Sequence, residues 1–280
     1  MQPTTITCQN CGNRFQGPYC NICGEQVYHE HDKRFAHFIE EAFHFITHFD
    51  TKYFQSFWLI FSRPGFLAQQ YSQGRRKKYF SPVSFFMIGV VIYLLFPLMQ
   101  GMNISFASHL SNNNGLHFHA LQRWAQHKAL VEHVSLEQIA EKFDHISPKI
   151  SKVLLVILIP MSALVLALLF NRGRHYYYFD HLMFAAEFNS FYLYSSFFLL
   201  PLLVILISKI FGLGLDAGDN AFFLTFQGLI ILLALTTALK RFYQLRFFIA
   251  LLYALLFLVL YLITILIYRY ILFAFVMLFI

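Results

Sequence analysis

The sequence predicts an all-α polytopic membrane protein, and three observations support this. Of its 280 residues, 58% are hydrophobic and only 12% are charged, whereas soluble domains carry about 25% charged residues. Five apolar segments have roughly the length of 20 residues that a bilayer span requires. The composition also excludes disorder, because 35 Phe and 16 Tyr supply abundant apolar surface. A soluble enzyme is therefore excluded, and no nucleophile elbow, phosphate loop or dinucleotide fingerprint is present to suggest catalytic residues.

Four cysteines stand near the N-terminus in the pattern Cys8-x2-Cys11 and Cys20-x2-Cys23, with a glycine after each second cysteine. Two cysteines separated by two residues form a tight knuckle, and four thiolates close a tetrahedral shell around Zn²⁺. Such a closed site stabilises a fold and leaves no position for substrate. We therefore predict a zinc ribbon over residues 1–30, with a structural Zn²⁺. Two disulfides or a bound iron are the alternatives.

Residues 31–81 are predicted to form an interfacial helix followed by a basic elbow. Apolar residues recur at three- and four-residue steps between Lys33 and Phe61, with charges between them, which is typical of an amphipathic helix at a membrane or partner surface. Arg63-Pro64-Gly65 is expected to end this helix. Glu41, His44 and His48 share one face, which a solvated surface explains more simply than a second metal site does.

The basic elbow contains Arg75, Arg76, Lys77 and Lys78, flanked by aromatic residues. Four clustered cations at a bilayer attract anionic lipid by about 1 kcal/mol each. The elbow is accordingly predicted to be a topology signal and lipid contact. Recognition of an acidic partner is the alternative. We expect no nucleic-acid binding, because the ribbon has Arg14 as its one basic residue.

Residues 82–280 are predicted to form the membrane domain. The expected spans are Pro82–Met102, Lys152–Phe170, Met183–Phe211, Ala221–Leu239 and Phe247 to about Tyr268. The tail Arg269–Ile280 either extends the last helix or lies along the interface. An outer loop covers residues 103–151, in which Ala120–Phe143 predicts one or two short amphipathic helices.

The distribution of Lys and Arg predicts the orientation. Basic residues concentrate before the first span and in the loops that hold Arg172, Arg174, Lys240, Arg241 and Arg246. The positive-inside rule then predicts a cytoplasmic N-terminus and, with five spans, a periplasmic C-terminus. The first thirty residues lack the apolar stretch of a signal peptide, so we expect the N-terminus to stay on the cytoplasmic side of the bacterial inner membrane.

Asp180, His181 and Glu187 lie near the start of the third predicted span. Ionisable groups at membrane depth are costly and normally face water or the protein interior. They therefore predict a polar site that binds a proton, an ion or a lipid headgroup. The alternative is a helix-packing contact with Arg172, Arg174, Lys240 or Arg241.

The ordered motifs together resemble domain-of-unknown-function family 3667, a group of bacterial zinc-ribbon membrane proteins. The matching residues are the ribbon cysteines with their glycines, Arg63-Pro64-Gly65, Tyr71, Gly74, Arg76, Tyr79, Pro82, His181-Leu182, Phe184, Phe191 and Leu239 to Tyr243. The resemblance implies a cytoplasmic zinc ribbon and several membrane helices. It implies no activity.

Two function hypotheses follow. The first is a non-enzymatic membrane protein whose ribbon and interfacial helix dock a protein partner or a second copy of the chain. The second is a small transporter, channel or lipid-handling protein that uses Asp180, His181 and Glu187. A membrane transferase has no supporting catalytic constellation.

Overall fold

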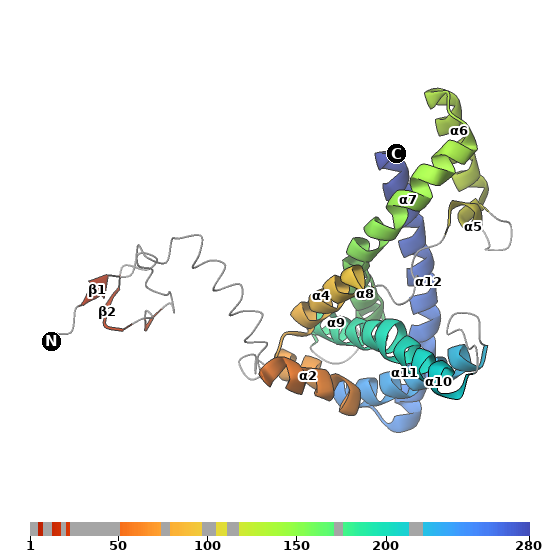
Figure 1. The fold of residues 1–280 in the computed structure, drawn as a ribbon. Helices are drawn as coiled ribbons and strands as arrows, with labels where there is room; N and C mark the ends of the chain where they lie inside the picture. Colours follow the sequence, from red (N-terminus) through yellow and green to blue (C-terminus); the bar gives the residue numbers. More distant parts are fainter. Residues whose placement is uncertain are drawn as a thin grey trace. The chain divides into compact units, whose positions relative to one another are not determined.

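A computed structural model describes residues 5–7, 13–17, 21–22, 51–73, 79–96, 105–110, 118–170, 176–212 and 221–280. The chain divides into two compact units, Met1–Thr51 and Lys52–Ile280. Three predicted features lie outside the described residues: the four ribbon cysteines, the helix face with Glu41, His44 and His48, and the basic elbow from Arg75 to Lys78. Figure 1 shows the helices of the second unit.

The described part of the first unit contains a small antiparallel hairpin. Strand β1 (Ile6–Thr7) pairs with β2 (Arg14–Phe15), with Ile6 opposite Phe15 and Thr7 opposite Arg14. Phe15 is buried at 5% exposure. The link between these two strands therefore holds Cys8 and Cys11.

Two short helices precede the membrane domain. Helix α2 (Thr51–Ser62) ends immediately before Arg63-Pro64-Gly65, as predicted, and α3 (Phe66–Ser72) follows. Gly65 adopts a left-handed φ of 80°, which glycine accepts without steric cost. Phe54 and Trp58 are 64% and 71% exposed, so α2 presents an apolar aromatic face.

Among the described residues, four helices are long and apolar enough to cross a membrane: Leu136–Phe170, Tyr178–Phe211, Thr225–Phe242 and Phe247–Phe279. The chain is thus a helical membrane protein. The first predicted span differs from expectation, because α4 (Pro82–Leu95) has 14 residues, fewer than a span requires. Pro82 stands in the first turn of α4, where its missing N–H has no helical partner to lose.

The second span is longer than predicted. Helix α7 (Leu136–Leu154) continues through the 3₁₀ turn η3 (Leu155–Ile157) into α8 (Leu158–Phe170), so the amphipathic part of the outer loop and the apolar span form one helix. Ser135 begins α7 with a capping box, in which its hydroxyl accepts from the Gln138 N–H. Helices α5 (Phe106–Leu110) and α6 (Phe118–Glu132) lie between α4 and α7 in the chain.

The third span is interrupted by a π-helical turn. Helix α9 (Tyr178–Tyr194) passes through η4 (Ser195–Leu199) into α10 (Leu200–Phe211), and Pro201 stands in the first turn of α10. Proline cannot donate to the preceding turn and clashes with it, so a wider turn before Pro201 relieves the conflict. Gly212, with φ of 64°, ends α10.

Helices α11 (Ala221–Phe242) and α12 (Phe247–Phe279) complete the domain. The segment Arg269–Ile280 extends the last helix, which was one of its two predicted positions. In Figure 1, α12 (blue) runs beside α7 (green). The Lys128 ammonium donates to the Met277 carbonyl at 2.5 Å, and so satisfies a main-chain acceptor near the C-terminal end of α12.

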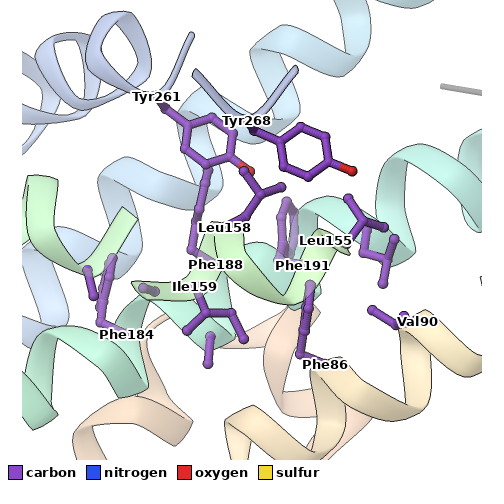
Figure 2. Packing of buried hydrophobic residues seen from close by; sticks show 14 of the residues in the cluster. Phe86, Val90, Leu155, Leu158, Ile159, Phe184, Phe188, Phe191, Tyr261 and Tyr268 are labelled. Atoms are coloured by element: carbon purple, nitrogen blue, oxygen red, sulfur yellow. The ribbon is translucent and has the colours of Figure 1, made fainter. Parts of the chain in front are cut away.

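Helix α9 lies at the centre of the packing, in contact with α3, α4, α8 and α11. Figure 2 shows Phe184, Phe188 and Phe191 of α9 beside Leu158 and Ile159 of α8. Each of these five side chains is buried, at 6% exposure or less. Many apolar side chains on the outer surface are instead exposed, as expected where lipid replaces water as the surrounding medium.

Candidate functional site on helix α9

Glu187 is buried at 3% exposure, and its carboxylate binds the main chain at the start of α3. The Gly65 N–H donates to Oε1 at 2.8 Å, and the Ala68 N–H donates to Oε2 at 2.6 Å. Both N–H groups belong to the first turn of α3, where no helical acceptor exists for them. The buried carboxylate and the buried helix end therefore satisfy each other.

Arg241, named among the possible packing partners of the polar site, contacts the same loop. Its guanidinium donates to the Pro64 carbonyl at 2.5 Å, and it lies close enough to Glu187 for electrostatic attraction. The Gln69 amide donates to the Arg241 carbonyl at 3.4 Å. The loop Arg63-Pro64-Gly65 is thus held between α9 and the end of α11.

Gly65 is required at this position for a second reason. A Cβ built on it would lie 2.7 Å from the Ala238 carbonyl oxygen and 2.8 Å from the Ala238 Cα. The main chains of the loop and of α11 therefore approach too closely for any side chain. Sequence motif and tertiary contact coincide here, because only glycine permits both the positive φ and the approach.

Asp180 and His181 bind other partners. The Asp180 carboxylate accepts from the Ser72 hydroxyl at 2.5 Å and from the Tyr177 N–H at 2.9 Å, so it joins the end of α3 to the start of α9. The His181 Nδ1 lies 2.7 Å from the Tyr243 hydroxyl, beyond the end of α11. The Tyr243 ring in turn stacks on Phe170 of α8 with centroids 3.9 Å apart.

The three predicted site residues lie on one helix, where Glu187 and Asp180 bind the two ends of α3 and His181 binds Tyr243. A cavity of about 20 Å³ lies beside Glu187, lined by Gly65, Phe184, Phe188 and Ala238 among others. That volume holds about one water molecule. The described groups thus form contacts between helices, and this cavity is too small for a lipid headgroup.

Asn189 was not singled out from the sequence, although its side chain joins α9 to two other helices. Its amide nitrogen donates to the Ser162 hydroxyl of α8 at 2.9 Å and to the Ala185 carbonyl at 2.8 Å, and its oxygen accepts from the Tyr261 hydroxyl of α12 at 2.8 Å. The sequence does contain a signal for Asn189, because it is a lone amide inside an apolar run. Such a group needs hydrogen-bond partners within a membrane.

A second tyrosine contact joins α2 to α9. The Tyr53 and Tyr194 hydroxyls lie 3.0 Å apart, and Tyr194 also donates to the Phe85 carbonyl of α4 at 3.4 Å. The Tyr53 ring stacks on Phe85 with centroids 4.8 Å apart. Polar contacts of α9 therefore reach α2, α3, α4, α8 and α12.

Comparison with known proteins gives one family. Residues 50–94 match the model of the family described as protein of unknown function (DUF3667), which confirms the resemblance found in the sequence. No curated protein matches the chain, and no solved structure does. The matched region contains α2, the Arg63-Pro64-Gly65 loop, α3 and α4, which are the segments that Glu187, Asp180 and Tyr194 hold against α9. By this match, the segment from residue 50 to residue 94 is similar to the DUF3667 family.

Proposed function

We propose that this protein is a non-enzymatic membrane scaffold whose N-terminal unit docks a protein partner at the membrane surface. The observation that supports the proposal most strongly is the use of the polar residues of α9. Asp180, His181 and Glu187 bind other helices of the same chain, as an anchor requires, and do not converge on one cavity. The second hypothesis, a transporter or lipid-handling protein built on these residues, has less support for the same reason.

The docking element in this proposal is a zinc ribbon of Cys8, Cys11, Cys20 and Cys23. The antiparallel register of β1 and β2 supports it, because a hairpin loop is where a two-cysteine knuckle fits. The metal would join four thiolates and so stabilise a unit too small to have an adequate core. Binding of anionic lipid by Arg75, Arg76, Lys77 and Lys78, and self-association, belong to the same proposal.

The proposed location is the bacterial inner membrane, with the N-terminus in the cytoplasm and the C-terminus outside. Helix α3, just before α4, binds the first turn of α9 through Ser72 and Asp180. Beyond α4, the Phe106 N–H donates to the Asp144 carboxylate of α7, and the Phe106 ring stacks on Phe273 near the end of α12. The chain from Pro82 to Phe106 thus joins opposite ends of the domain, which supports a fifth crossing.

Metal analysis and cross-linking in cells together test the scaffold proposal. We expect one zinc per full-length protein and its loss in Cys8→Ser and Cys20→Ser, whereas the exposed control Gln16→Ser retains it. A protein cross-linked to the wild type should be lost from both cysteine variants and kept by the control. Zinc-free wild type would contradict the ribbon, and partners retained by folded cysteine variants would contradict docking.

A further inference from the structure

The end of the membrane domain where α7 and α12 meet carries two cations without an acidic partner. The Tyr268 hydroxyl of α12 donates to the Ser151 carbonyl of α7 at 2.5 Å, and the residues that follow these two are Arg269 and Lys152. Across the described part of the chain, neither cation forms an ion pair with a carboxylate. The Lys152 ammonium lies 5.4 Å from the centre of the Tyr93 ring.

Arg269 is only partly solvated and lacks one hydrogen bond. Its Nε is fully buried and has no acceptor among the described residues, and the Tyr192 and Tyr268 hydroxyls are its electrostatic neighbours. Arginine remains charged at any physiological pH, so Arg269 cannot avoid the cost of a partly buried charge by losing a proton. A half-buried guanidinium in a membrane protein without an anion is unfavourable, and an anion is the group that would complete the site.

His109 of α5 supplies a second incomplete group on the same side. Its ring is buried at 7% exposure and packs against Phe273, which is one helical turn beyond Arg269 on α12, with centroids 5.3 Å apart. Its Nε2 also has no hydrogen-bond partner among the described residues. The His109 Nε2 of α5 and the Arg269 Nε of α12 thus both lack a hydrogen-bond partner among the described residues, and the two helices are in contact.

Both cations stand at about the depth of the lipid headgroups. Phe170 ends α8 and stacks on Tyr243, which precedes Phe247 at the start of α12, so these residues mark one end of the bundle. With a rise of roughly 1.5 Å per residue, Arg269 lies about 33 Å along its helix from Phe247, and Lys152 about 27 Å from Phe170. The hydrocarbon core of a bilayer is about 30 Å thick.

We propose that Arg269, together with Lys152 and His109, binds the phosphate group of a membrane lipid at this end of the domain. The planar fork of arginine presents Nε and Nη as parallel donors that match two phosphate oxygens, while lysine contributes a point charge. A lipid phosphate reaches this depth, and it is the anion that every bilayer presents there. The site lies apart from Asp180 and Glu187, so the inference does not depend on the proposed docking function.

The test measures lipid retained by the full-length protein in detergent, by native mass spectrometry after titration with phosphatidylglycerol. We expect Arg269→Gln and Lys152→Gln to weaken the tightest binding by about tenfold or more, because each loses a charged hydrogen bond. Lys149→Gln, an exposed lysine one turn earlier on α7, is the matched control and should bind like the wild type. Equal lipid binding in all four proteins would overturn the proposal.

Two further arms separate folding from binding and identify the ligand. Arg269→Lys keeps the charge and loses the fork, so the folded variant should bind lipid more weakly than the wild type and more tightly than Arg269→Gln. Inorganic phosphate, added to delipidated wild type, should compete with phosphatidylglycerol if the headgroup phosphate is the bound group. Binding of diacylglycerol as tightly as phosphatidylglycerol would contradict phosphate recognition, and binding of inorganic phosphate with no binding of lipid would contradict the lipid source.

Discussion

The Gly65 N–H donates a hydrogen bond of 2.8 Å to the Glu187 carboxylate, across 122 residues of sequence. This contact joins the most distinctive short motif of the chain, Arg63-Pro64-Gly65, to a buried acid of the membrane domain. The Ala68 N–H binds the other oxygen, so both carboxylate oxygens are used at the first turn of α3. The motif and the acid are therefore parts of one structural unit.

Replacement of Glu187 tests the strength of this unit. Glu187→Gln keeps the shape but replaces one acceptor oxygen by an NH₂ group, which faces an N–H donor. We expect a loss of about 1–3 kcal/mol in the free energy of unfolding, because one main-chain donor becomes unsatisfied in a buried site. Thermal unfolding in detergent measures this, with Glu141→Gln on the exposed face of α7 as the control. Equal losses in both variants would refute the role of the carboxylate.

Gly65→Ala tests the close approach of the loop to α11. The variant must accept the positive φ and also a Cβ that would lie 2.7 Å from the Ala238 carbonyl oxygen. Gly212→Ala provides a matched control, since Gly212 has φ of 64° and no atom within 4 Å of the built Cβ. Left-handed strain alone costs about 1–2 kcal/mol in each variant.

We accordingly expect Gly65→Ala to destabilise the protein clearly more than Gly212→Ala, and to increase protease cleavage near residue 65. The difference between the two melting temperatures isolates the steric collision from the backbone strain. Similar melting temperatures would mean that α3 and its loop move away from α11 without cost, and hence that the loop is not fixed in the way described.

The sequence predicts the class of this fold better than its contacts. Apolar runs located the membrane helices, because length and hydrophobicity are local properties. The same rule placed the start of the second span at Lys152, where α7 in fact continues unbroken from Leu136. Pro148 stands at the junction of the amphipathic and apolar stretches, and sequence rules expect a helix to end near a proline, but α7 continues through it.

The polar residues of α9 show the same difference between what the sequence predicts and what it leaves open. Asp180, His181 and Glu187 were identified as unusual from their position in an apolar segment, since buried ionisable groups are rare. Their partners could not be inferred, because Gly65, Ser72 and Tyr243 meet α9 only through tertiary packing. For Glu187 the binding groups are main-chain N–H groups, which no side-chain pattern reveals.

The contact between Asn189 and Tyr261 can be measured by a double-mutant cycle. Asn189→Ala and Tyr261→Phe each remove one side of a 2.8 Å hydrogen bond between α9 and α12. Interhelical hydrogen bonds in membranes contribute about 0.6 kcal/mol on average and at most about 1.7. We expect a coupling energy in this range, because the cycle cancels the separate loss of the hydrogen bond to Ser162. A coupling energy of zero would show that the two helices are held by apolar packing alone.

The stability of the segment around His109 should depend on pH. Burial, followed by the positive charge of Arg269, lowers the pKa of His109 from 6.5 to about 4, while Asp144 acts in the opposite direction. The folded protein therefore keeps His109 neutral at pH values where the unfolded chain binds a proton. Stability is complete above about pH 6.5 and declines as the pH falls towards 4.

The loss over this interval amounts to at most about 3 kcal/mol, since one pKa unit corresponds to about 1.4 kcal/mol. His109→Phe preserves the ring contacts with Phe143 and Phe273 and cannot bind a proton, so it should flatten this part of the profile. His145→Phe, at an exposed position of α7, is the control for a histidine-to-phenylalanine change elsewhere in the same region. Unfolding measured between pH 4 and pH 8 checks this expectation. A phosphate bound near Arg269 favours the protonated imidazole and raises the pKa of His109 in the folded protein. Added anionic lipid should therefore make the decline smaller and end it at a higher pH. An unchanged profile with lipid would separate His109 from the proposed phosphate site.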